Sequence, residues 1–137
     1  MYSNILVAID PTHEPKHKDA IELATQLAKD ANSEITAVSV IEPMPNYLPK
    51  IDIPEDMKTK AGEIALGKLR NFVGMTSEVK TRLLHGRAAH EILQFANENK
   101  IDCIIIASHQ PGFSDYLLGS TAARVVRYAK CAVHITR

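Results

Sequence analysis

The sequence predicts a Rossmann-like α/β fold: a single domain with an open, parallel five-stranded sheet and helices on both faces. Segments typical of strands alternate with segments typical of helices along the whole chain, and this alternation is typical of parallel sheets with right-handed crossovers. Two strand segments are almost wholly apolar, as are strands buried on both faces. The chain has 137 residues, which is the length of one domain, so we expect residues 1–137 to form one unit.

Five segments are predicted as strands. The first and the fourth are the almost wholly apolar ones, and we expect them at the centre of the sheet. The third alternates apolar residues with lysine and arginine, so that one of its faces should meet water, as at a sheet edge. Strand order 3-2-1-4-5 satisfies both demands. In chain order, the strand segments are Asn4–Ile9, Ile35–Ile41, Glu78–Leu84, Cys103–Ala107 and Ala132–Thr136.

Four segments between the strands carry apolar side chains at the three- and four-residue spacing of amphipathic helices. Pro15 suits the first turn of the first helix, where no N–H donor is needed, and the apolar stripe of this helix continues to Ala31. The third helix is expected over residues 88–97. The fourth begins near Gly119 and places Val126 on its apolar face.

The second helix, expected over residues 54–73, has a broad apolar face that includes Met57 and Ile64. Gly62 and Gly67 interrupt this helix, and each weakens it by about 1 kcal/mol relative to alanine. Packing of the apolar face on the sheet must therefore hold it. The preceding connection, residues 42–53, contains three prolines and is longer than most connections. We expect it to form a flap or a partner surface.

Sixteen basic and sixteen acidic residues give a formal net charge of zero. Binding of nucleic acid or of a membrane surface by bulk electrostatics is therefore not expected, and no apolar run is long enough to span a bilayer. Cys103 and Cys131 make neither a disulfide framework nor a zinc site, and Cys103 is expected to be buried. The N-terminus has no signal-peptide pattern, so a cytoplasmic location is expected.

The predicted strand order reverses between the first and the fourth strand. Ligands of open α/β sheets bind at such a point, beyond the carboxyl ends of the strands, which singles out Asp10 and Ser108-His109-Gln110. The fourth helix begins with Gly119-Ser120-Thr121, where unpaired N–H groups, the helix dipole and two hydroxyls suit a phosphate. We expect an anion there, and simple capping of the helix by Ser120 stays open as the alternative.

Other kinds of site are not expected. The chain has no phosphate loop with a lysine, and no G-x-G-x-x-G motif follows the first strand. His13 and His17 are four residues apart but have no third metal ligand in a recognisable pattern. Ser108 and His109 are adjacent in the chain and therefore make a poor catalytic pair.

Four stretches of the chain carry a family resemblance. The first three are NILVAID at residues 4–10, SVIEP at residues 39–43 and LLHGRAAHEIL at residues 83–93. The fourth and most specific is IIIASHQPGFSDYLLGSTAARVVRYAKCAVHITR at residues 104–137. Together they resemble the universal stress protein family over the whole sequence, and the last stretch resembles the F-type branch of that family.

The resemblance implies a fold similar to that of the adenine nucleotide alpha hydrolases and a role in stress response or signalling rather than catalysis. It also implies binding of ATP, ADP or AMP, with or without Mg²⁺. Many members bind ATP with the glycine signature G-x2-G-x9-G-[ST]. Ala107 and Gln110 stand at the first two glycine positions here, and only Gly119-Ser120 is retained as written.

The resemblance also implies roles for individual residues. Asp10 would face the ribose or the adenine, Val40 would present backbone groups to the adenine edge, and the start of the fourth helix would hold the phosphates. The residues expected to bind the nucleotide are Ala8, Asp10, Val40, Ala107, Ser108, His109, Gln110, Gly119, Ser120 and Thr121.

The fifth strand is expected at an open edge of the sheet, which can pair with another chain. A two-fold dimer through this strand is the economical arrangement, and the resemblance implies the same homodimer, alone or doubled into a tetramer. Two other functions stay open. One is an interaction module that binds no nucleotide, which the lost glycines favour. The other is a slow ATP-hydrolysing or phosphotransfer enzyme, for which Asp10 and Asp115 are the available acids.

Overall fold

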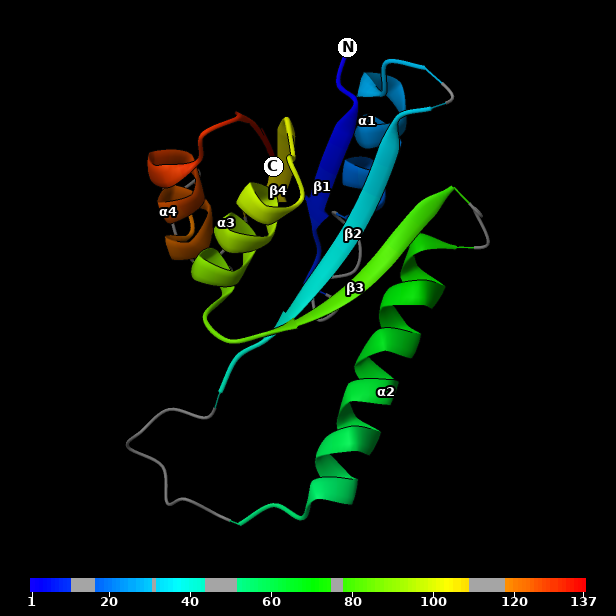
Figure 1. The fold of residues 1–137 in the computed structure, drawn as a ribbon, viewed down its shortest axis with the longest axis vertical. Helices are drawn as coiled ribbons and strands as arrows, with labels where there is room; N and C mark the ends of the chain where they lie inside the picture. Colours follow the sequence, from blue (N-terminus) through cyan, green and yellow to red (C-terminus); the bar gives the residue numbers. More distant parts are fainter. Residues whose placement is uncertain (11–16, 31, 44–51, 75–77, 109–117) are drawn as a thin grey trace.

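The computed structural model describes residues 1–10, 17–30, 32–43, 52–74, 78–108 and 118–137. Strands and helices alternate along this part of the chain (Figure 1). The strands are β1 (Asn4–Ala8), β2 (Glu34–Ile41), β3 (Val79–His85), β4 (Cys103–Ala107) and β5 (Ala132–Thr136). The helices are α1 (His17–Leu27), α2 (Glu55–Val73), α3 (Ala88–Glu98) and α4 (Ser120–Tyr128).

The strands form one parallel sheet in the order β3-β2-β1-β4-β5, which confirms the predicted fold class and strand order. The central strands β1 and β4 are buried on both faces because their side chains are almost all apolar. Lys80 and Arg82 are exposed on β3, at the edge of the sheet. Because all strands run in one direction, their carboxyl ends meet at one edge.

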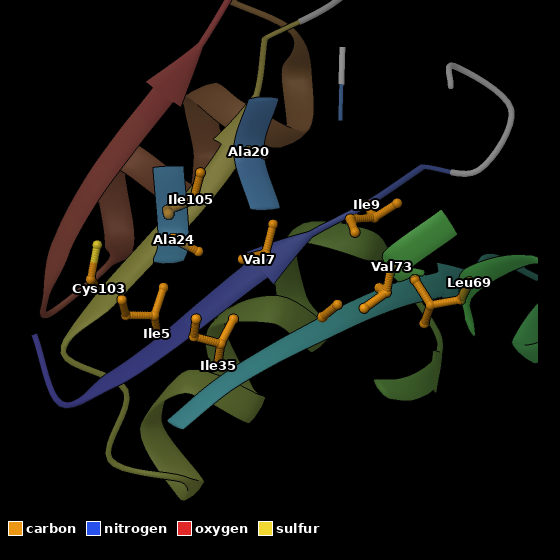
Figure 2. Packing of buried hydrophobic residues seen from close by; sticks show 11 residues of the cluster. Ile5, Val7, Ile9, Ala20, Ala24, Ile35, Leu69, Val73, Cys103 and Ile105 are labelled. Atoms are coloured by element: carbon orange, nitrogen blue, oxygen red, sulfur yellow. The ribbon is translucent and has the colours of Figure 1, made fainter. Parts of the chain in front are cut away.

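Each face of the sheet packs against two helices. Ile5 and Val7 of β1 point to one face, where they belong to one buried cluster with Ala20 and Ala24 of α1 and Leu69 of α2 (Figure 2). Successive residues of a strand point to opposite faces, so the residues between them serve the other face. That second cluster includes Leu6, Ala89, Ile92, Ala96, Ala122 and Val125, which come from β1, α3 and α4.

The second helix departs from the prediction. Leu69 and Val73 are its buried residues, whereas the side chains of Met57 and Ile64 are 57% and 61% exposed. The N-terminal turns of α2 project past the carboxyl edge of the sheet (Figure 1), and neither Met57 nor Ile64 belongs to a buried cluster. The expectation that Met57 and Ile64 pack in the core is therefore wrong.

The ends of two other helices also differ from the prediction. Helix α1 ends at Leu27, and the chain then pairs with the N-terminus through a bridge between Ala28 and Tyr2. Pro15 and Ala31 lie outside the described residues, as does most of the connection over 42–53. In α4, Val126 is 45% exposed, because it lies on the solvent side of a helix whose buried residues are Ala122 and Val125.

The helices and the buried cysteine also bear on the sequence predictions. Among the described residues, no helix is both long and apolar enough to cross a membrane. Cys103 is fully buried in β4, as predicted, and its burial raises the pKa of the thiol from 9.0 to about 11. A buried thiolate is disfavoured because it loses its hydration.

The buried thiol of Cys103 predicts a loss of stability in alkali. Between about pH 9 and 11 the unfolded chain has released a proton that the folded chain retains, so the free energy of unfolding should fall as pH rises through this range. Urea unfolding at a series of pH values measures the fall. The variant Cys103→Ala should lose this part of the pH dependence, and an unchanged dependence in that variant would contradict the assignment.

Replacing Gly67 with alanine is expected to raise the free energy of unfolding. It lies inside α2, and a Cβ atom added there meets no other atom within 4 Å. Glycine inside a helix is less favourable than alanine by about 1 kcal/mol. Gly67→Ala should therefore raise the free energy of unfolding by about 0.5–1 kcal/mol in urea titrations. A loss of stability in Gly67→Ala would contradict this expectation.

Candidate functional site

A cavity of about 790 Å³ lies at the carboxyl ends of β1, β2 and β4. The ends of these strands form its base, and the starts of α3 and α4 and one side of α2 form its walls. The strands contribute Ala8, Ile9, Asp10, Val38, Ser39, Val40, Ile41, Glu42, Ile106 and Ala107, and the helices contribute Ala61, Ile64, Ala65, Lys68, Ala88, Ile92, Gly119, Ser120, Thr121 and Ala122.

Seven of the ten residues predicted to bind a nucleotide line this one cavity: Ala8, Asp10, Val40, Ala107, Gly119, Ser120 and Thr121. Ser108 is not among the lining residues. Its N–H donates to the C=O of Thr136 at 2.9 Å and so joins the end of β4 to the end of β5. His109 and Gln110 lie outside the described residues.

The start of α4 opens into the cavity. Gly119 occupies the N-cap position, Ser120 is the first helical residue, and within the described part of the chain no side chain caps the helix. Capping by Ser120, the alternative from the sequence, is therefore wrong because Ser120 lies one position too late. The first intrahelical bond joins the N–H of Ala123 to the C=O of Gly119 at 2.9 Å. The N–H groups before it have no partner within the helix, which suits an anion.

The start of α3 lines the same cavity, but a carboxylate of the protein already binds to its N-terminus. The N–H of Ala88, the first residue of α3, donates to Oε1 of Glu42 at 3.0 Å. A carboxylate is favourable at the positive end of a helix. Glu42 would repel a second anion at α3, so an anionic ligand in this cavity is expected at α4. The sequence does not predict Glu42 as a site residue, because its contact with Ala88 joins residues 46 positions apart in the chain.

The backbone of Val40 faces the cavity beyond the end of β1. The C=O of Val38 accepts the N–H of Ile9 at 2.8 Å, so it points toward β1. Alternate residues of a strand direct their backbone groups to the same side, and Val40 therefore has the orientation of Val38. The pairing of β1 with β2 ends at Ala8 and Val38. The N–H and C=O of Val40 are thus directed past the end of β1. The polar edge of a planar ligand could form hydrogen bonds with both groups there.

One wall of the cavity is apolar. Ala61, Ile64 and Ala65 line it from α2, on the part of the helix that projects past the sheet. This placement gives the exposed side chain of Ile64 a role that its spacing in the sequence did not reveal. An apolar wall and a few polar groups at fixed positions are typical of small-molecule sites.

The charged groups are few. Among the described residues that line the cavity, Asp10 and Glu42 are acidic and Lys68 is basic. No group of three or more histidine, cysteine or acidic residues that could hold a metal ion occurs in the described part of the chain. The cavity can therefore hold a flat, partly apolar group against α2 and Val40, and an anion at the start of α4.

Comparisons with known proteins agree on one family. A model of the universal stress protein family matches residues 1–137. Universal stress protein A homolog 1 of Coxiella burnetii is 31% identical over 138 residues, which cover 96% of this chain and 94% of that protein. Among solved structures, universal stress protein UspA of Lactobacillus plantarum has a TM-score of 0.74 and 27% identity, covering 99% of this chain and 98% of its own.

A further solved structure has the same fold and contains a ligand. It is a universal stress protein in complex with cAMP, with a TM-score of 0.69 and 20% identity. The superposition covers 99% of this chain and 97% of that protein.

Proposed function

This chain belongs to the universal stress protein family, and we propose that it binds an adenine nucleotide in the cavity at the carboxyl ends of β1, β2 and β4. One observation carries the proposal: Asp10, Val40 and the start of α4, which come from distant parts of the chain, line a single cavity. The ligand is AMP, ADP or ATP, with Mg²⁺ accompanying the longer phosphate chains.

The phosphate group lies at the start of α4. Backbone N–H groups of the first turn point toward the cavity, and the hydroxyls of Ser120 and Thr121 are available as further donors. No lysine is required, because the helix dipole and the N–H groups together favour an anion. This arrangement suits a chain whose formal net charge is zero.

The adenosine part lies between β2 and the end of β1. The N–H and C=O of Val40 meet the polar edge of the adenine, whose faces pack against the apolar wall of α2. Asp10 follows β1 and accepts hydrogen bonds from the ribose hydroxyls. The adenine mononucleotide in the solved relative with cAMP supports a ligand of this class.

The protein acts in stress response or signalling, through a change in conformation or assembly that depends on the nucleotide, rather than as an enzyme. Part of the proposal is a homodimer, or a tetramer built from it, in which the open edge of β5 pairs with the same strand of a second chain. A cytoplasmic location is also proposed, because both cysteines are free thiols and a reducing compartment keeps them so.

Calorimetric titration with AMP and with ATP plus Mg²⁺ tests the proposal, together with acid extraction of the purified protein to detect bound adenine nucleotide. Heat of binding for either ligand, or a co-purified adenine nucleotide, is the expected result. No heat at millimolar concentration and no extracted nucleotide would contradict the proposal and favour an interaction module that needs no nucleotide. Repeated turnover of ATP by the purified protein would instead favour an enzyme.

A further inference from the structure

Glu42 is held at a defined place on the cavity wall. It directly follows β2, and its carboxylate oxygen Oε1 accepts the N–H of Ala88 at 3.0 Å. The next residue is Pro43, which restricts the backbone of Glu42 to extended conformations. The residue is exposed, and its hydrogen bond to the start of α3 directs the carboxylate to this wall.

The remaining lone pairs of this carboxylate can accept a hydrogen bond from a ligand. A carboxylate accepts several hydrogen bonds and donates none. Among the described residues, the hydrogen bond recorded for the Glu42 side chain is the one from Ala88. Glu42 also lines the cavity, so a ligand that offers an N–H donor at this wall has an ionised acceptor.

Val40 and Glu42 both line the cavity at the end of β2. They are two residues apart, a distance of about 6–7 Å along extended backbone. The C=O of Val40 is directed past the end of β1, and the carboxylate of Glu42 lies at the start of α3, so one wall of the cavity carries two acceptors. An amino group with two N–H donors can satisfy both.

We propose that Glu42 is a specificity-determining residue that selects a 6-aminopurine. Its carboxylate accepts one N–H of the 6-amino group, while the C=O of Val40 accepts the other. This inference rests on the proposed function. A purine with a carbonyl oxygen at position 6, such as hypoxanthine or guanine, would place an acceptor against two acceptors. It would lose both hydrogen bonds and meet the charge of the carboxylate, which lowers its affinity relative to a 6-aminopurine.

The affinities for AMP and IMP, which carry an amino group and an oxygen at position 6, test the inference by calorimetry. In Glu42→Gln the side-chain oxygen still accepts from Ala88, while the amide can donate to the oxygen of IMP. The unaltered protein should prefer AMP. In Glu42→Gln the ratio of the two dissociation constants should fall about tenfold, the effect of one hydrogen bond to a charged group.

Glu63→Gln is the matched control, because it removes the same charge from an exposed position on α2 that does not line the cavity. Its ratio should equal that of the unaltered protein. If AMP binds and Glu42→Gln retains the full preference for AMP, Glu42 only caps α3 and the inference is overturned, while the proposed function stands. Absence of AMP binding by the unaltered protein would overturn both.

Discussion

Gly119→Val should lower the affinity for adenine nucleotides by at least about 100-fold. Gly119 lines the cavity at the N-cap of α4, directly before the N–H groups proposed to hold the phosphate. A branched side chain there would occupy the space in front of these groups and keep the phosphate from reaching them. Charge-assisted hydrogen bonds contribute about 1.5–3 kcal/mol each, so the loss of two accounts for the expected effect.

The backbone at Gly119 makes this a test of space rather than of folding. Its φ of −57° and ψ of 153° are open to any residue, so valine can adopt the native conformation. Circular dichroism and the melting temperature check that the variant folds. Val126→Ala is the control, because Val126 lies exposed on the same helix outside the cavity. Undiminished affinity in Gly119→Val would mean that the phosphate lies elsewhere.

Gly86→Ala should lower the free energy of unfolding by about 2 kcal/mol. Gly86 joins β3 to α3 with a φ of 139°, a conformation that costs a residue with a side chain about 1–3 kcal/mol. An added Cβ would also lie 2.5 Å from Oε1 of Glu91, so that this side chain would have to move. The glycine is therefore required by its backbone conformation and by the space around it.

A double variant separates the two causes. In Gly86→Ala with Glu91→Ala the close contact is absent, whereas the strain of the positive φ remains. Urea unfolding of the two single variants and the double variant should assign most of the loss to the backbone, because the Glu91 side chain is flexible. Unchanged stability of Gly86→Ala would contradict this account.

The N–H of Gly86 also donates to the C=O of Ile41 at 3.0 Å. Because Ile41 is next to Glu42, Gly86→Ala should also weaken nucleotide binding.

The sheet and its ligand edge could be predicted because they follow from local patterns. The apolar runs of β1 and β4 identify strands buried on both faces, and the exposed Lys80 and Arg82 identify an edge strand. Once the strand order is known, the carboxyl ends of β1 and β4 are adjacent. Asp10 and the start of α4 then lie at one cavity, although the sequence separates them by more than 100 residues.

Features that depend on how far one element extends past another could not be predicted. The apolar spacing of α2 is the same whether Ile64 meets a strand or a cavity, and its 61% exposure follows from the projection of α2 beyond the sheet. The N-cap of α4 lies at Gly119 rather than Ser120, a difference of one residue that the residue types alone do not determine, because both glycine and serine are favourable at an N-cap.

Local patterns in the sequence are enough to predict the α/β class, the strand order, the family and the edge of the sheet at which the cavity lies, because periodicity and apolar runs are local properties. Contacts between distant segments set the arrangement within the cavity. They place the carboxylate of Glu42 at the start of α3 and Gly119 at the N-cap of α4, and they direct the backbone of Val40 past the end of β1. These arrangements depend on contacts between residues distant in the chain, and the spacing of residues along a sequence does not encode such contacts.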